Sequence, residues 1–308
     1  MLKYLIVMLD RASVPFCHHE PAEKNEGLIS AADLKNAIRF GMKENLVIQF
    51  VYPDRAIPAE LENIIETIDH VKIKPYPSGK DDVLVADIGA IPQKAENETL
   101  VIRASIQELA EKVSEVENAI YRFKRVNIIL KEPDSISEED AGAYKLFLDR
   151  LTYYIAGQTA SGKELPQFNL LTDRILLDKM NNCGAGDESI TIAPDGKMYV
   201  CPAFYYDGDA PVEWDKEEGL QLPNAQLYRL DHAPICRACD AFQCHRCVWL
   251  NRRRTLEVNT PGHTQCILSH HERNASRNLL GRLREAGIAA TLKDIPELDY
   301  LDPFEIVK

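Results

Sequence analysis

The chain has 308 residues, 45% of them hydrophobic and 27% charged, which is enough for one large or two medium domains with a buried core. Its formal net charge of -12 argues against broad nucleic-acid binding. No apolar run reaches about 18 residues, so no membrane span is predicted, and the short apolar start without a basic leader is typical of a first strand in a cytoplasmic protein.

Short apolar stretches alternate with amphipathic stretches from residue 3 to about residue 173. The apolar stretches predict strands at Tyr4–Leu9, Leu46–Tyr52, His70–Lys74, Val83–Ala86, Thr99–Arg103, Val126–Leu130 and Phe168–Leu171. The amphipathic stretches predict helices at Ser30–Lys43, Pro58–Ile68, Ser105–Lys124 and Ser137–Ala156. This alternation implies an α/β fold with a mostly parallel sheet, and about six βα units suit a full or partial (β/α)6 barrel of the TIM type.

After Asp173 the composition shifts to glycine, proline, cysteine and turn residues. The turn Pro194-Asp195-Gly196 predicts a β-hairpin between Ser189–Ala193 and Lys197–Val200 that would hold Cys183 and Cys201 near a common site. Residues 207–232 have the composition of an acidic loop, and His271–Ala286 predicts a closing helix.

Nine arginines lie between Arg237 and Arg284, against three acidic residues. They either offset the negative charge of thiolate-bound clusters and cap the closing helix, or form a docking surface for an acidic peptide or partner.

Seven of the eight cysteines fall between Cys183 and Cys266, including the run Cys236-x2-Cys239-x4-Cys244-x2-Cys247. Closely spaced thiolates suit soft metals such as zinc or the iron of Fe–S clusters. The gap between the two Cys-x2-Cys pairs is shorter than in a four-cysteine zinc ribbon. Seven cysteines divide naturally into one complete four-thiolate site and one three-cysteine site, which favours Fe–S over zinc and leaves zinc open.

This cysteine order resembles the seven-cysteine SPASM domain of radical SAM peptide-modifying enzymes, with two middle spacings one residue shorter. The resemblance implies two auxiliary [4Fe-4S] clusters. The first would be bound by Cys183, Cys201 and Cys247, and the second by Cys236, Cys239, Cys244 and Cys266. The open position of the first cluster would be left for another ligand, for which the candidates are His232, His245 and His263, unless these are ordinary loop histidines.

The amino-terminal half lacks the radical SAM motif. A C-x3-C-x2-C trio follows the first strand in that family, whereas residues 13–20 of this chain contain a single cysteine, Cys17. The Gly-Gly-Glu stretch after the second strand is replaced by Val51-Tyr52-Pro53-Asp54-Arg55. We therefore expect no SAM cofactor. The segment Cys17-His18-His19-Glu20 is either a metal site or a vestigial loop that contacts a partner.

The whole chain resembles the CXXX repeat peptide maturases, which are radical SAM/SPASM-like proteins without a working SAM cluster. The resemblance implies a degenerate radical SAM-like partial barrel at 1–175, a SPASM-like Fe–S domain at 176–270, and a C-terminal helix and tail at 271–308. It also implies a heterodimer with a radical SAM maturase and a ribosomal precursor peptide with cysteine repeats, on which the pair forms a thioether or similar crosslink.

Three alternatives differ in chemistry. The chain would be an independent enzyme that uses the Cys17 segment or a cluster as Lewis acid, a peptide-binding adaptor whose Fe–S metal is only structural, or a zinc adaptor. The precursor, the bond formed and the redox-active cluster are not readable from cysteine order, because reduction potential depends on burial and on hydrogen bonds to sulfur.

Overall fold

The computed structural model describes residues 2–20, 27–133, 135–178, 183–241, 244, 246–288 and 292–297. The chain forms two compact units that are interleaved along the sequence. The first unit takes residues 1–86, 92–98 and 184–232, and the second takes residues 87–91, 99–183 and 233–308. The three domain boundaries expected from the sequence stay a prediction. Among the described helices, none combines the length and the apolar character that crossing a bilayer requires.

The first unit is built on strands in the order β4-β3-β2-β1-β8-β9. Neighbouring strands are parallel except β8 and β9, which form an antiparallel hairpin. The bounds are β1 Tyr4–Met8, β2 Val47–Val51, β3 Val71–Lys74, β4 Val83–Asp87, β8 Ser189–Ile192 and β9 Met198–Tyr199. Strand β1 pairs with β2 on one side and with β8 on the other, so it lies in the interior of this sheet.

Both faces of strand β1 are buried, which accounts for its nearly continuous run of apolar residues. Leu5 and Val7 pack into the same core as Leu34 of α1, whereas Met8 packs with Tyr199 of β9. Helix α1 (Ala31–Lys43) begins at Ser30, whose hydroxyl accepts a hydrogen bond from a first-turn amide. The other elements of the unit are α2 Ala59–Ile65, α7 Pro202–Tyr206, β10 Glu213–Asp215, β11 Gly219–Gln221, η2 Ala225–Tyr228 and η3 Leu230–His232.

The hairpin predicted at Pro194-Asp195-Gly196 is confirmed. The Gly196 amide donates to the Ala193 carbonyl at 2.9 Å, which closes a four-residue turn with proline at its second position. Gly196 has a φ of 77°, a region that glycine enters without a steric cost. The Asp195 carboxylate then accepts a hydrogen bond from the Tyr199 hydroxyl at 2.7 Å, which ties the turn to β9.

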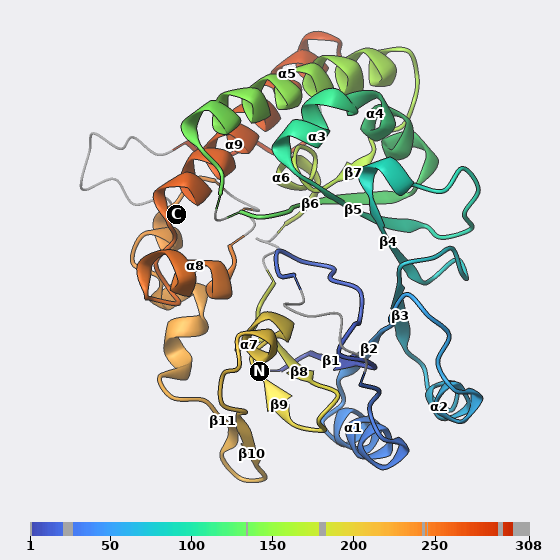
Figure 1. Cartoon of the computed structure of the whole chain (residues 1–308). Coiled ribbons are helices and arrows are strands. Elements are labelled where there is room, and N and C mark those ends of the chain that lie inside the picture. Colours follow the sequence, from blue (N-terminus) through green and yellow to red (C-terminus); the bar gives the residue numbers. More distant parts are fainter. Residues whose placement is uncertain are drawn as a thin grey trace. The chain divides into compact units, whose positions relative to one another are not determined.

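The second unit combines three parallel strands with longer helices. The strands are β5 Thr99–Ala104, β6 Arg125–Leu130 and β7 Gln167–Phe168. The helices are α3 Ile106–Glu111, α4 Val113–Arg122, α5 Glu138–Ala160, α6 Asp173–Leu176, α8 Val248–Thr255 and α9 His263–Glu285, with the short 3-10 helices η1 Ile88–Ala90 and η4 Cys236–Ala238. Helices α5 and α9, far apart in sequence, lie side by side (Figure 1).

The mixed α/β architecture with mostly parallel strands agrees with the sequence prediction, and closure into a partial barrel stays a prediction. Three details differ. The predicted helix 105–124 breaks at Lys112, whose backbone leaves the helical region. The predicted strand 168–171 ends at Phe168, because the Thr172 side chain and amide capture its backbone groups. The closing helix begins at His263, eight residues before the predicted start.

Candidate metal centre

Electrostatic interactions link four cysteines of the second unit. Cys236 begins η4, Cys239 follows it, Cys244 comes five residues later, and Cys266 lies in the first turn of α9. The thiolate charge of Cys236 acts on Cys244, and the thiolate charges of Cys239 and Cys266 act on Cys236. The charge of Cys239 acts on Cys244 and Cys266 as well. These are the four cysteines that the sequence predicts in the second cluster.

The environment of these sulfurs opposes thiolate formation in the absence of a cation. Burial, together with repulsion from neighbouring thiolates, raises the pKa of Cys236 to about 11 and that of Cys244 to about 12. Burial also raises the pKa of Cys266. The thiols therefore hold their protons at neutral pH, and a bound soft metal would displace those protons because it binds thiolates.

Buried guanidinium groups act in the opposite direction. Arg246 lowers the pKa of Cys236, and Arg174 lowers that of Cys244. Arg174 is fully buried and donates to the Glu272 carboxylate at 2.9 Å, and Glu272 also accepts from the buried Tyr144 hydroxyl at 2.8 Å. This network joins α5, α6 and α9 beside Cys244, and it holds positive charge where thiolates would carry negative charge.

Asp240 anchors the segment after η4 to helix α9. Its carboxylate is 2% exposed and pairs with the guanidinium groups of Arg273 and Arg277, the second at 3.1 Å. Both arginines belong to α9, so the residue that follows Cys239 is fixed to the same helix that carries Cys266.

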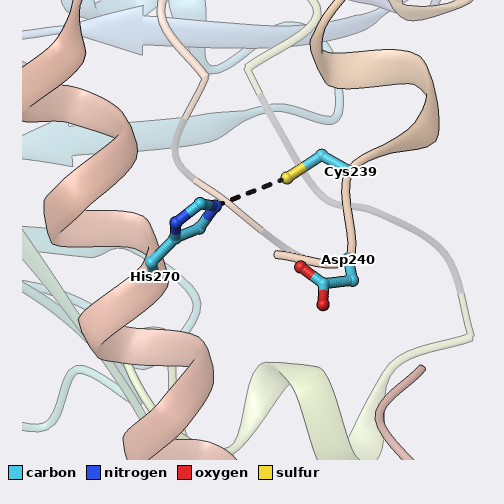
Figure 2. Close-up of side chains that lie close together, drawn as sticks. All are labelled: Cys239, Asp240 and His270. Carbon is cyan, nitrogen blue, oxygen red and sulfur yellow. Dashed lines mark hydrogen bonds between the residues drawn. The ribbon is translucent and has the colours of Figure 1, made fainter. Parts of the chain in front are cut away.

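His270 adds an imidazole to the cysteine group (Figure 2). Its Nε2 lies 3.9 Å from the Cys239 sulfur, which also accepts a hydrogen bond from the Ala241 amide at 3.3 Å. One ligand atom each of Cys239, Asp240 and His270 lie within 4.8 Å of one another. Because two arginines already hold Asp240, Cys239 and His270 are the two residues of this trio that could donate to a metal. Burial lowers the pKa of His270, which favours the neutral imidazole that binds metals.

The helices around the site are joined by side-chain amides. The Gln265 side chain accepts from the Gly262 amide at 2.7 Å, which caps the start of α9. The same side chain donates to Asn251 of α8 at 3.1 Å, and Asn251 donates to the Val258 carbonyl at 2.9 Å. Cys266, next to Gln265, is therefore held at a fixed joint between α8 and α9.

The three cysteines predicted in the first cluster are divided between the two units. Cys183 and Cys247 belong to the second unit, where Cys183 is exposed and Cys247 precedes α8. Cys201 precedes α7 in the first unit. The first cluster therefore stays a prediction.

Two of the three histidines predicted as candidates for the open position of the first cluster lie among the described residues. His232 is exposed and lies 3.1 Å from its neighbour Asp231. His263 is the first residue of α9, and His245 lies outside the described residues.

The loop after β1 is fixed by polar contacts in the first unit. Asp10 is fully buried and accepts from Arg55 at 2.6 Å, and Ser13 donates to the Val51 carbonyl at 2.8 Å. Further along, the Cys17 sulfur lies 2.8 Å from Nδ1 of the buried His19. Arg55, in the loop after β2, thus forms a partly buried ion pair with Asp10, two residues after β1.

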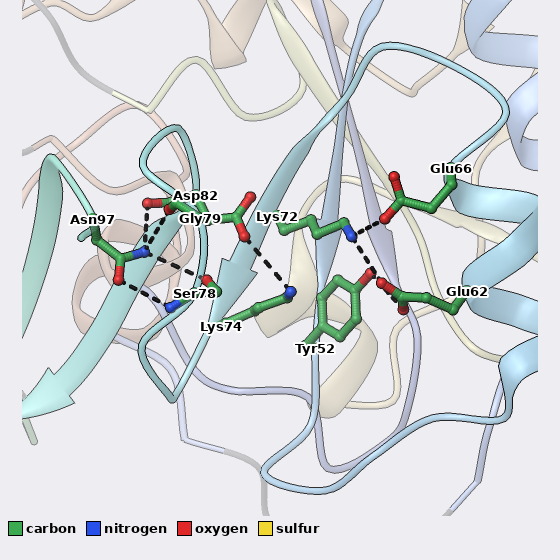
Figure 3. A network of polar contacts seen from close by, with 9 residues as sticks. All are labelled: Tyr52, Glu62, Glu66, Lys72, Lys74, Ser78, Gly79, Asp82 and Asn97. Carbon is green, nitrogen blue, oxygen red and sulfur yellow. Dashed lines mark hydrogen bonds and ion pairs between the residues drawn. The ribbon is translucent and has the colours of Figure 1, made fainter. Parts of the chain in front are cut away.

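Two buried lysines of β3 are explained by structural ion pairs (Figure 3). Lys72 pairs with Glu66 and with Glu62 at 2.7 Å, and Lys74 lies 3.6 Å from Asp82. Burial works against the charge on Lys72, but the two carboxylates outweigh it and raise its pKa. Lys72 is therefore a cation that binds α2 to β3, and it is not a neutral amine nucleophile.

No protein-family model matches the chain, and no curated protein matches it. Solved structures do match its fold. "Native anSMEcpe with bound AdoMet and Cp18Cys peptide" aligns with a TM-score of 0.61 and 12% identity, covering 93% of this chain and 99% of that chain. "Crystal structure of Streptococcus suis SuiB bound to precursor peptide SuiA" aligns with a TM-score of 0.52 and 10% identity, covering 86% and 76%.

These similarities concern the fold alone. The chain shares its fold with a protein solved with bound AdoMet and a peptide, and with a protein solved with a precursor peptide. A second structure of the first enzyme, the histidine-tagged protein with bound AdoMet, aligns with a TM-score of 0.59 and 11% identity over 93% of this chain and 99% of that chain.

Proposed function

We propose that this protein is an Fe–S cluster-bearing subunit of a peptide maturase, and that it does not cleave SAM itself. The observation that carries the proposal is the gathering of Cys236, Cys239, Cys244 and Cys266 at the start of α9. Four soft sulfur donors close together, one buried and three partly buried, suit a four-thiolate cluster. The fold shared with enzymes that bind peptides supports a peptide as the second partner.

The residues around these sulfurs fit an anionic cluster. A four-thiolate Fe–S centre carries net negative charge, and Arg174 and Arg246 already act on the sulfurs as cations. The Ala241 amide donates to the Cys239 sulfur, a contact of the kind that tunes reduction potentials. The cluster would supply an electron-transfer or structural centre, while the chain's own residues hold it, neutralise it and exclude water.

The absence of SAM cleavage is proposed from the loops after β1 and β2. One cysteine stands where three are needed, and the Asp10–Arg55 ion pair joins the ends of these two strands. Radical generation then falls to a separate radical SAM maturase that forms a heterodimer with this chain.

The first predicted cluster, on Cys183, Cys201 and Cys247, would leave one position for a further ligand. A cysteine of a cysteine-repeat precursor peptide fits that position, because a metal-bound thiol is held deprotonated and oriented for carbon–sulfur bond formation. This part of the proposal predicts that thioether formation stalls when any of the three cysteines is replaced by alanine while the other cluster stays loaded.

The test is anaerobic purification of the full chain, alone and with a radical SAM maturase, followed by iron and acid-labile sulfide counting. Two clusters give about eight irons per chain. The Cys236→Ser variant is expected to lose about half of the iron, and Cys17→Ser, which changes a cysteine outside both sets, is expected to lose none. Stoichiometric zinc without iron or sulfide would refute the Fe–S proposal and favour a zinc adaptor.

A further inference from the structure

Cys17 and His19 form a close thiol–imidazole pair in the loop after β1. Their Sγ and Nδ1 atoms lie 2.8 Å apart. The His19 ring is 2% exposed and stacks on Tyr206 of α7, with centroids 5.3 Å apart and 25° between the planes. The edge of Phe16 packs against the same ring at 6.1 Å. The imidazole is thus oriented by aromatic packing, with Nδ1 directed at the sulfur.

The groups around this pair are fixed by polar contacts. Asp10, whose charge acts on the Tyr206 hydroxyl together with that of Cys17, is neutralised by Arg55 at 2.6 Å. The Tyr206 hydroxyl donates to the Arg11 carbonyl at 2.9 Å, which fixes the ring that stacks on His19. An aromatic face attracts a cation that lies over it. The other titratable groups of this loop and of α7 are Arg11, His18, Glu20 and Tyr205.

We propose that Cys17 is a nucleophilic thiolate activated by His19, and that it exchanges with disulfides, either of a cysteine-containing peptide or of a small thiol. The Cys17 sulfur attacks one sulfur of the disulfide, and a mixed disulfide forms as the original S–S bond breaks. The other half leaves as a thiolate and takes up the proton from His19 Nδ1. The exchange conserves oxidation state, so no external oxidant is needed. Cys17 lies outside the seven cluster cysteines, so the proposal does not rest on the metal centre.

The expected gain in rate follows from the thiolate fraction. An ordinary thiol with a pKa of about 8.5 is about 1% ionised at pH 6.5. Cysteines activated by a neighbouring imidazolium ionise well below an ordinary thiol, and one that is half ionised at pH 6.5 presents about fifty times more thiolate. Its lower basicity makes each thiolate about eightfold less reactive. Cys17 should therefore react about sixfold faster than free cysteine at pH 6.5.

The experiment uses the full chain, anaerobically purified, with Ellman's disulfide as the probe and mass mapping of the labelled peptide. The His19→Gln variant is expected to lose the sixfold gain, and His18→Gln, a matched change at the adjacent position, is expected to keep it. Oxidised glutathione and a disulfide-linked dimer of a cysteine peptide then compete for Cys17, and the faster of the two identifies the source of the disulfide.

Two results would overturn the proposal. One is a Cys17 rate at pH 6.5 equal to that of free cysteine, and the other is an unchanged rate in His19→Gln. If His19→Gln does not fold, the pH profile of the unmodified chain decides. The rate at Cys17 should change by less than about twofold between pH 7 and 8, whereas an ordinary thiol gains several-fold over that range, and such a gain would reject the pairing.

Discussion

Asp240 offers a sharp test of how the cysteine group is organised, because it is both near the candidate metal donors and paired with two arginines. Replacing Asp240 by asparagine keeps the size and removes the charge. Breaking a buried ion pair costs about 3–5 kcal/mol. The lower end applies here, since the Arg277 side chain is 23% exposed and can be partly hydrated, and since the new amide oxygen still accepts one hydrogen bond. We expect a loss of about 3 kcal/mol.

The assay is urea unfolding of the metal-free protein, and the fluorescence of Trp249 in α8 reports the transition. A Trp214→Phe background removes the signal of the first unit, because the chain has only these two tryptophans. Arg150→Gln is the matched control. It breaks the ion pair of Arg150 with Glu117, but Arg150 is 55% exposed, so the expected loss is much smaller than that of Asp240→Asn.

A role of Asp240 as an anchor and a role as a metal ligand predict different results for Asp240→Asn. An anchor lowers the stability of the metal-free chain, and metal content falls only as a consequence. If Asp240→Asn left the metal-free stability unchanged and still lowered the metal content, Asp240 would be a ligand, and the reasoning from its two arginines would be refuted.

Three further predictions concern buried groups and one turn. Glu272→Gln should cost about 3 kcal/mol in urea unfolding, because it leaves a buried guanidinium without its carboxylate, and a loss below about 1 kcal/mol would contradict this. The metal-free protein should lose stability as the pH rises from about 8.5 toward 11, because Cys236 and Cys244 bind protons more tightly in the folded than in the unfolded chain. That fall is at most about 1.4 kcal/mol per pH unit for each thiol and should vanish in the metal-loaded chain. Gly196→Ala should lower the melting temperature, since the added methyl group would lie 2.7 Å from the Asp33 carboxyl carbon at a positive φ, and an unchanged melting temperature would contradict the turn geometry.

Regular periodicity made most of the α/β part predictable. Strand β1 ends at Met8, one residue before its predicted end, and α1 begins at Ala31, one residue after its predicted start. At the start of α3, Ser105 and Glu108 form a capping box, as serine followed three residues later by glutamate favours. The break at Lys112 was not predictable, because neither glycine nor proline marks it.

The candidate site was only partly predictable. The resemblance to the SPASM domain grouped these four cysteines, and that grouping stays a prediction. His270 was missed because the closing helix was expected to begin at His271. With the helix starting at His263, Cys266 and His270 are one turn apart on one face, which is the signal that could have found it. The Arg174–Glu272 pair was hidden for another reason. Its members are 98 residues apart, and composition cannot tell a buried charge from an exposed one.

The pairing of β1 with β8 bears on how the protein is made. Tyr4 pairs with Ser189, so β1 leaves the ribosome 185 residues before the strand that covers one of its edges. At about 5–20 residues per second this interval lasts roughly ten to forty seconds. An apolar strand edge is a template for pairing with other chains during such a wait. An amino-terminal fragment that stops short of Ser189 therefore keeps that edge open permanently and should aggregate, whereas a chain that includes β8 closes it from within.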